Sequence, residues 1–248
     1  MSSKPYRLRS GVALYASVLG VLALLSCAPE PPPTIILWAW ERTEDLRFLS
    51  PDEAEIAILV NRIVLRDDQV EPYPRTQPVA APDGISVMPV VRIEAARPSL
   101  DDAQLEKLVA SIRRTTRDSR FHGLQIDFDA LESQRGFYRQ LLERLRPDYE
   151  PLSVTALVSW CFEPSWLAGL PVDEIVPMVF RMGPGAQTWV ERMDREKGFS
   201  FSGCNGSLGV ATDEPLRWRP PSLRLYAFHT QPWTAADYIA FAGGRFQR

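Results

Sequence analysis

The sequence holds few of the residues on which metal and nucleophile sites depend. Only two of its 248 residues are histidines and only three are cysteines. His122 and His229 have no second ligand at metal-binding spacing, so neither a metal nor another cofactor is expected. No glycine-rich phosphate loop follows a strand-like segment, and no Gly-x-Ser-x-Gly motif surrounds Ser153 or Ser159. Nucleotide binding and serine-hydrolase chemistry are therefore not expected.

Clusters of positive charge and runs of membrane-spanning length are also missing. No Lys/Arg run or basic patch is present, which argues against nucleic acid as a partner. The apolar run at residues 11–25 covers about fifteen residues, which is short for a membrane span. What is present is an ordinary globular composition, with 45% hydrophobic, 24% charged and 10% aromatic residues.

The first 26 residues have the pattern of a signal peptide. Lys4, Arg7 and Arg9 precede the apolar run, and no acidic residue accompanies them. The motif "LLSC", Leu24–Cys27, resembles the lipobox of bacterial lipoproteins. Removing residues 1–26 takes three of the 28 basic residues and none of the 31 acidic residues, which leaves a net charge of −6.

The lipobox resemblance implies cleavage before Cys27 and lipid on that residue, which would anchor the chain to a membrane. Residues 27–34 then form a proline-rich tether, and residues 35–248 form one domain. Ala28 follows the cysteine, so the resemblance implies the bacterial cell envelope, facing the periplasm, with the outer membrane favoured over the inner. A plain secretory peptide is the alternative. Cys161 and Cys204 form either a disulfide or two free thiols.

Strand-like and helix-like segments alternate along the rest of the chain. Helices are predicted at 98–119, with Ser99 as the N-cap, and at 133–148, 185–198 and 234–244, with Thr234 as the last cap. Eight strands are predicted, at 34–40, 55–65, 85–94, 123–130, 152–160, 174–180, 207–212 and 222–229.

This order predicts an α/β fold, specifically a (β/α)8 TIM-type barrel of irregular form. The segment 66–84 is too rich in proline for a helix, so early helices should be weak or missing. A doubly wound open sheet is the alternative.

The stretch "HGLQIDFDALES", residues 122–133, carries the candidate chemistry. With a period of two, Gln125, Asp127 and Asp129 share one face of a strand, and Leu124, Ile126 and Phe128 share the other. In a closed barrel the polar face points inward, and Asp129 is nearest the C-terminal mouth, where such enzymes have their sites. Crowded carboxylates raise at least one pKa. Asp127 and Asp129 are therefore the predicted catalytic pair.

Other predicted strands supply polar partners for these two acids. Arg92 and Glu94 share a face near the end of one strand, and Arg181 ends another. Either arginine could form a forked ion pair with an aspartate. A buried polar network that only braces the barrel would explain the same residues.

"HGLQIDFDA" resembles the fourth-strand signature of family-18 chitinase-like glycosidases, Asp-Gly-x-Asp-x-Asp-Trp-Glu. The resemblance matches Asp127 to the third aspartate and Asp129 to the catalytic glutamate. Phe128 replaces the tryptophan, and His122 and Gln125 replace the first two aspartates. The resemblance implies a carbohydrate substrate and an acid at position 129, with Asp127 beside it.

The motifs "VVRIE", "LQIDFDA", "YRQLLERLR", "LSVTALVSWC", "VDEIVPMVFRMG" and "ATDEP" together resemble the domain of unknown function 3142 family, an uncharacterised bacterial family. The resemblance covers nearly all of the chain after the signal peptide. It implies a TIM-barrel-like fold and no particular reaction.

Aromatic residues near predicted strand ends suit a sugar-binding pocket, because the C–H faces of sugars stack on indole rings. Trp40 and Trp160 are the predicted platforms. Further candidates for substrate binding are Arg92, Glu94, Gln125, Arg181 and, after the seventh strand, Asp213.

Two hypotheses follow from these features. The first is an envelope-anchored, glycosidase-like barrel that hydrolyses a polysaccharide or cell-wall glycan through carboxylate acid/base chemistry. The second is a non-catalytic lipoprotein, derived from such a barrel, that binds a glycan or another envelope protein.

Overall fold

The computed structural model describes residues 34–96, 100–163, 165–214 and 224–244. The predicted signal peptide, Cys27 and the tether before Thr34 lie outside the described residues, as does Ser99. Within the described ranges, no helix combines the length and the apolar character needed to cross a membrane.

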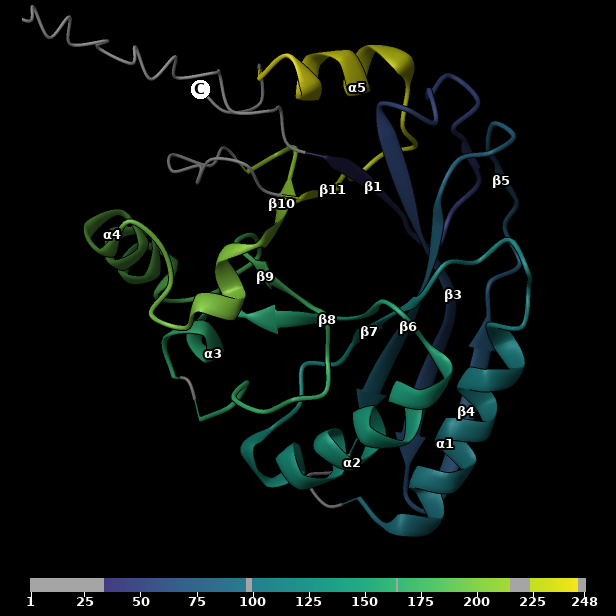
Figure 1. Cartoon of the computed structure of the whole chain (residues 1–248), viewed down its shortest axis with the longest axis vertical. Helices are drawn as coiled ribbons and strands as arrows, with labels where there is room; N and C mark the ends of the chain where they lie inside the picture. Colours follow the sequence, from purple (N-terminus) through teal and green to yellow (C-terminus); the bar gives the residue numbers. More distant parts are fainter. Residues whose placement is uncertain (1–33, 97–99, 164, 215–223, 245–248) are drawn as a thin grey trace, which may run out of the picture. The chain divides into compact units, whose positions relative to one another are not determined.

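Eight parallel strands form a closed barrel (Figure 1). The ring closes because β1 pairs in parallel with both β3 and β11. Every predicted strand is present and in the predicted order, so the barrel is confirmed and the open sheet is excluded. Around the ring the strands are β1 (Ile35–Ala39), β3 (Ala54–Arg66), β6 (Val87–Ala95), β7 (Leu124–Asp127), β8 (Leu152–Leu157), β9 (Glu174–Met178), β10 (Ser207–Ala211) and β11 (Arg224–Phe228).

The four predicted helices are present, with shorter bounds. They are α1 (Asp102–Thr115), α2 (Arg135–Leu145), α4 (Ala186–Glu196) and α5 (Ala235–Ala242). Thr234 caps α5 as predicted. The N-cap of α1 is Asp101 rather than Ser99, because the Asp101 carboxylate accepts the backbone N–H of Gln104 at 2.8 Å, within a full capping box. Short 3₁₀ turns occupy Glu132–Gln134, Arg146–Asp148 and Ser202–Asn205.

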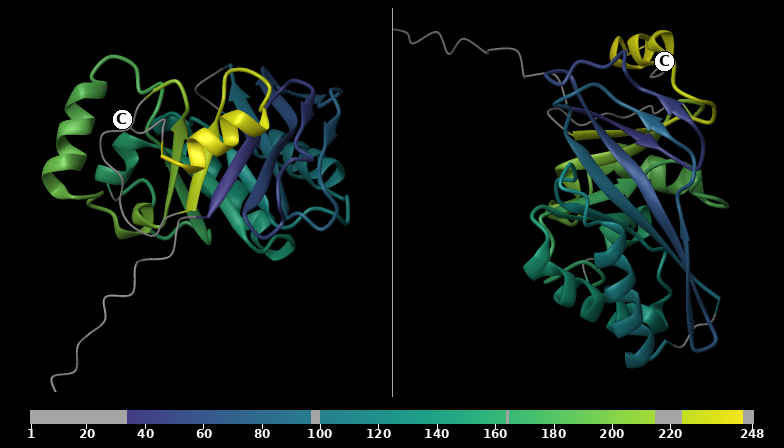
Figure 2. Two further views of the ribbon diagram at one scale, coloured as in Figure 1. Left: turned by 90° about the horizontal axis from the view of Figure 1, so that it is seen from above. Right: turned by 90° about the vertical axis from the view of Figure 1, so that its right-hand side faces the viewer.

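The early part of the barrel is irregular, as the proline content predicts. Between β3 and β6 the structure has β4 (Gln69–Pro74), which pairs antiparallel with β3, in place of a helix. Two further short strands, β2 (Glu44–Asp45) and β5 (Val79–Ala80), pair with each other. Figure 2 shows β3 and β4 running together as a long ribbon along one side of the barrel.

The alternation in residues 124–128 separates two cores. Leu124, Ile126 and Phe128 belong to the large core between the barrel and its helices. Gln125 and Asp127 lie on the opposite face, next to the smaller core inside the barrel that includes Trp38 and Tyr226. The strand is therefore oriented as predicted, with its polar face toward the barrel interior.

A disulfide joins Cys161 to Cys204 across 43 residues of sequence. Cys161 lies in α3 (Val158–Phe162), a short helix directly after β8, and Cys204 lies in the 3₁₀ turn before β10. Closing a loop of this length stabilises a fold by about 3–4 kcal/mol, mainly by restricting the unfolded chain. The bond thus holds α3 in place beside the C-terminal end of the barrel.

Candidate functional site

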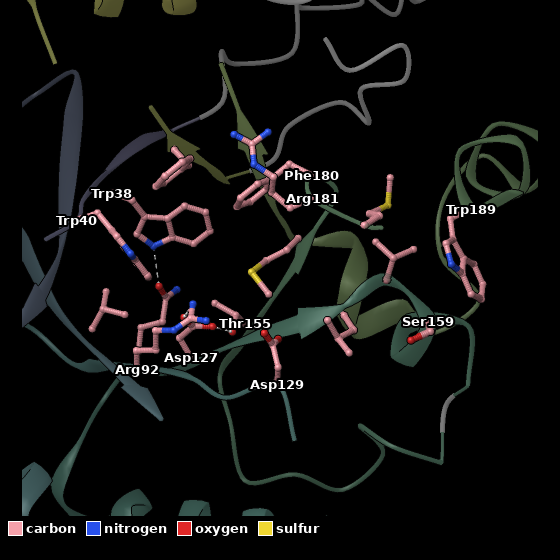
Figure 3. Close-up of a pocket in the computed structure, with 17 residues that line it drawn as sticks. Trp38, Trp40, Arg92, Asp127, Asp129, Thr155, Ser159, Phe180, Arg181 and Trp189 are labelled. Carbon is pink, nitrogen blue, oxygen red and sulfur yellow. Dashed lines mark hydrogen bonds and ion pairs between the residues drawn. The ribbon is translucent and has the colours of Figure 1, made fainter. Parts of the chain in front are cut away.

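A pocket of about 430 Å³ opens at the C-terminal mouth of the barrel (Figure 3). This is the end of the barrel at which such folds place their active sites. Its polar lining consists of Arg92, Gln125, Asp127, Asp129, Thr155, Ser159 and Arg181. Its aromatic lining consists of Trp38, Trp40, Phe180, Trp189 and Phe228.

Gln125 lines this pocket and is fully buried. Its Oε1 accepts a hydrogen bond from Trp38 Nε1 at 2.8 Å, and its Nε2 donates to Ser153 Oγ at 3.1 Å. The amide is therefore satisfied inside the protein and orients the indole of Trp38. Gly209 on β10 makes room for that indole, since a Cβ there would lie 2.8 Å from the ring.

Asp127 is buried and hydrogen-bonded through both of its oxygens. Arg92 Nη1 donates to Oδ2 at 3.1 Å, and Thr155 Oγ1 donates to Oδ1 at 2.8 Å. Burial raises the pKa of the Asp127 carboxyl, and the charge of Arg92 and the hydrogen bond from Thr155 act in the opposite direction. Asp127 is thus a fixed internal acid, not a group free to move.

Asp129 is the accessible acid of the site. Its side chain is exposed at the pocket mouth, and within the described ranges it makes no hydrogen bond or ion pair. The pocket walls still withhold part of its hydration, which raises the pKa of the Asp129 carboxyl. The negative charge of Asp127 raises it further, and Arg92 lowers it. Asp129 is therefore a carboxyl that holds its proton to higher pH than an ordinary aspartate does.

Arg92 links the two acids to the protein surface. Its Nε donates to Glu94 Oε1 at 3.1 Å, and its guanidinium lies 5.9 Å from the centre of the Trp40 ring. Burial disfavours the charge on Arg92, but Asp127, Glu94 and Asp129 outweigh this effect and raise its pKa. Glu94 does not line the pocket, so it acts through Arg92 and not by touching a ligand.

Arg181 lines the pocket but does not bind an aspartate of β7. Its guanidinium forms ion pairs with Asp213, at 2.7 Å, and with Glu214. Asp213 is not part of the pocket lining, and its pKa is lowered by the hydrogen bond from Arg181. Asp213 therefore does not contact a ligand in this pocket, contrary to the prediction. Arg181 and Asp213 instead form an ion pair at the edge of the pocket.

Trp160 is not a platform, which corrects the sequence-based prediction. The chain turns into α3 after Leu157, so Trp160 leaves the strand and is buried in the outer core. There its ring stacks on Trp166 at 4.4 Å. A strand pattern that continues into a short buried helix gives no periodicity signal of the change, because both are apolar.

Trp40 lines the pocket as predicted, and its companions come from elements that sequence reasoning did not connect. Phe228 meets Trp40 edge-on at 6.2 Å, and Phe180 stacks on Phe228 at 5.8 Å. Thr155 and Trp189 were also missed as site residues. Thr155 could have been found from its position two residues after Ser153 on an inward strand face, whereas Trp189 has no such signal.

The arrangement combines one accessible proton donor, one fixed carboxylate paired with an arginine, and a wall of aromatic rings. A donor of raised pKa beside a second acid is what acid-catalysed bond cleavage near neutral pH requires. Aromatic rings with few convergent polar groups are typical of pockets for small polar ligands that have apolar faces.

Comparison with solved structures finds chains with a similar fold. The structure described as "putative Chitinase A from Streptomyces coelicolor" aligns with 87% of this chain and 96% of its own, with a TM-score of 0.53 and 12% sequence identity. At this identity the similarity shows the fold alone, which is a (β/α)8 TIM-type barrel. No family model matches the chain, and no curated protein matches it.

Proposed function

We propose that this protein is a glycoside hydrolase that acts on a polysaccharide or cell-wall glycan, with Asp129 as the proton donor. The observation that carries the proposal is the Asp129 carboxyl itself. It is unpaired among the described residues, its pKa is raised, and it opens into a pocket lined by Trp38 and Trp40.

The hydrogen bonds of Asp127 determine which of the two aspartates carries the catalytic proton. Asp127 already accepts hydrogen bonds on both oxygens, so a proton shared by the pair resides on Asp129. Asp129 then gives this proton to the glycosidic oxygen as the bond to the anomeric carbon breaks. Asp127 stabilises the positive charge that develops on the sugar ring. Water adds to the anomeric carbon and returns a proton to Asp129, which restores the starting state.

Two resemblances support this proposal. The chitinase-like structural neighbour has the same type of barrel. The strand signature around Asp127 and Asp129 resembles that of family-18 glycosidases. His122 is exposed near the other end of β7, so it stands apart from the pocket and is not part of the proposed chemistry.

A second candidate function is glycan binding without hydrolysis, or binding of another envelope protein. The satisfied hydrogen bonds of Gln125 and Asp127 favour it, because most of the polar groups inside the barrel already have protein partners. The aspartate at position 129 is also one methylene shorter than the glutamate of the family-18 signature.

The two functions are separated by a panel of envelope glycans. Purified protein should release reducing ends from at least one of chitin oligosaccharides, peptidoglycan strands or another cell-wall polysaccharide, with faster release at mildly acidic pH. The measurement is product formation by mass spectrometry. Binding to a glycan without any product would favour the second function, and the absence of both binding and product would reject both glycan proposals.

We also propose that the protein is anchored through lipid on Cys27 in the cell envelope, facing the periplasm, with the outer membrane favoured. The Cys161–Cys204 disulfide supports this, because such bonds persist in oxidising compartments and because Cys27 is the remaining cysteine of the sequence. Cys27→Ser should move the protein from the membrane fraction to the soluble fraction and abolish labelling by radioactive palmitate. The Cys161→Ser/Cys204→Ser variant should remain labelled. Equal labelling of wild type and Cys27→Ser would contradict the anchor.

A further inference from the structure

The pocket extends well beyond the two acids, toward α4. Its lining includes Leu157 and Ser159, at the end of β8 and the start of α3, and also Met182 and Trp189. In Figure 3, Trp40 and Trp189 lie at opposite ends of the pocket, with Asp129 between them. The proposed proton donor therefore stands in the middle of an elongated pocket, not at its closed end.

Trp189 is held as a half-buried ring at the far end. Its ring stacks on Phe162 at 5.6 Å with an interplanar angle of 12°. The guanidinium of Arg192 lies 4.1 Å from the centre of the Phe162 ring. Phe162 belongs to α3, which the Cys161–Cys204 disulfide fixes. Trp189 thus rests on a rigid base and faces the pocket without having to be ordered by a ligand.

The lining between Asp129 and Trp189 is suited to a sugar. Ser159 lines this part, and its hydroxyl makes no hydrogen bond within the residues that the structure describes. Leu157 is 37% exposed and adds apolar surface to this part of the pocket. A free hydroxyl beside apolar surface matches a sugar ring, which has hydroxyl groups at its edge and C–H groups on its face.

From this geometry we propose that Trp189 is a second sugar platform and that the ligand is a linear oligosaccharide of at least two units. One unit lies against Trp40, the next lies against Trp189 and Ser159, and the bond between them passes Asp129. The inference depends on the proposed function, because it assumes that the pocket binds a glycan. It adds that the ligand is a chain crossing the acid and that Trp189 is the residue that selects for chain length.

The test is a chain-length series with the full-length protein carrying Asp129→Asn, so that binding is measured without turnover. The probes are N-acetylglucosamine and its β-1,4-linked di- to hexasaccharides, with glucose and its β-1,4 oligosaccharides in parallel. Calorimetry should show at least tenfold tighter binding of the disaccharide than of the monosaccharide. Adding Trp189→Ala should weaken oligosaccharide binding by about tenfold and leave monosaccharide binding unchanged.

Two further variants keep the result interpretable. Trp189→Phe retains a stacking ring and should keep most of the affinity. Tyr238→Ala removes an aromatic ring from α5, outside the pocket, and should change nothing. Equal effects of Trp189→Ala on mono- and oligosaccharides, or no effect on either, would overturn the inference and leave the proposed function intact. No binding of any saccharide by any form would overturn the proposed function and the inference together.

Discussion

Asp129→Asn should lower glycan turnover by about 10²- to 10⁴-fold, the usual loss when a positioned general acid is removed. The amide has nearly the same shape as the carboxyl but cannot give a proton to the glycosidic oxygen. Because the Asp129 side chain has no protein partner among the described residues, the fold should keep its stability, and the affinity for the intact glycan should change little. The measurements are kcat and KM on the best substrate of the glycan panel.

The pH profile gives an independent check on the same residue. The proposed reaction needs Asp129 protonated, so activity should fall as the pH rises through the pKa of its carboxyl. Burial and the neighbouring Asp127 raise this pKa, so the fall should occur above the 3.8 of an ordinary aspartate. Asp52→Asn, at an exposed site before β3, is the matched control and should leave the profile unchanged. Equal turnover by Asp129→Asn and wild type would remove Asp129 from the mechanism.

Arg92→Met should destabilise the fold by about 3 kcal/mol, because it leaves the buried Asp127 carboxyl without its cation. Breaking a buried ion pair from one side costs about 3–5 kcal/mol, and the lower end applies here because the Arg92 side chain is 35% exposed. The measurement is the free energy of unfolding from urea titrations at pH 7.5. Arg47→Met breaks an exposed ion pair with Asp45 and should cost less than about 1 kcal/mol.

The loss in free energy of unfolding caused by Arg92→Met should increase with pH. Burial raises the pKa of Asp127, and removing Arg92 raises it further. An acid whose pKa is higher in the folded state stabilises the fold fully below its unfolded pKa, near 3.8, and this contribution is lost as the pH rises through the folded pKa. The difference between Arg92→Met and wild type should therefore be largest at neutral pH and shrink toward pH 4.

A double variant tests whether the unpaired charge of Asp127 causes the loss of stability in Arg92→Met. Asp127→Asn removes the unpaired charge and keeps an oxygen for the Thr155 hydroxyl, so Arg92→Met/Asp127→Asn should recover most of the lost stability at pH 7.5. The loss of stability could instead be constant with pH, or Asp127→Asn could fail to relieve it. Either result would show that Arg92 stabilises the fold by packing and not by charge.

The sequence by itself determined the barrel and the orientation of its central acids. The order of strands and helices follows from hydrophobic periodicity, and the alternation from Leu124 to Phe128 separates the inner face from the outer one. These are local properties, because a side chain's direction along a strand depends only on its position in that strand. The same reasoning placed Asp129 at the mouth and Trp40 in the pocket.

Only the tertiary structure decided which residues meet. Arg92 and not Arg181 pairs with Asp127, because β6 is the neighbour of β7 and its register sets Arg92 opposite Asp127, whereas β8 separates β9 from β7. Trp160 left the pocket because the chain bends into α3, and Trp189 entered it from α4. The Cys161–Cys204 bond likewise depends on elements 43 residues apart. Such contacts arise when the ring of strands closes, and no periodicity within a single segment encodes them.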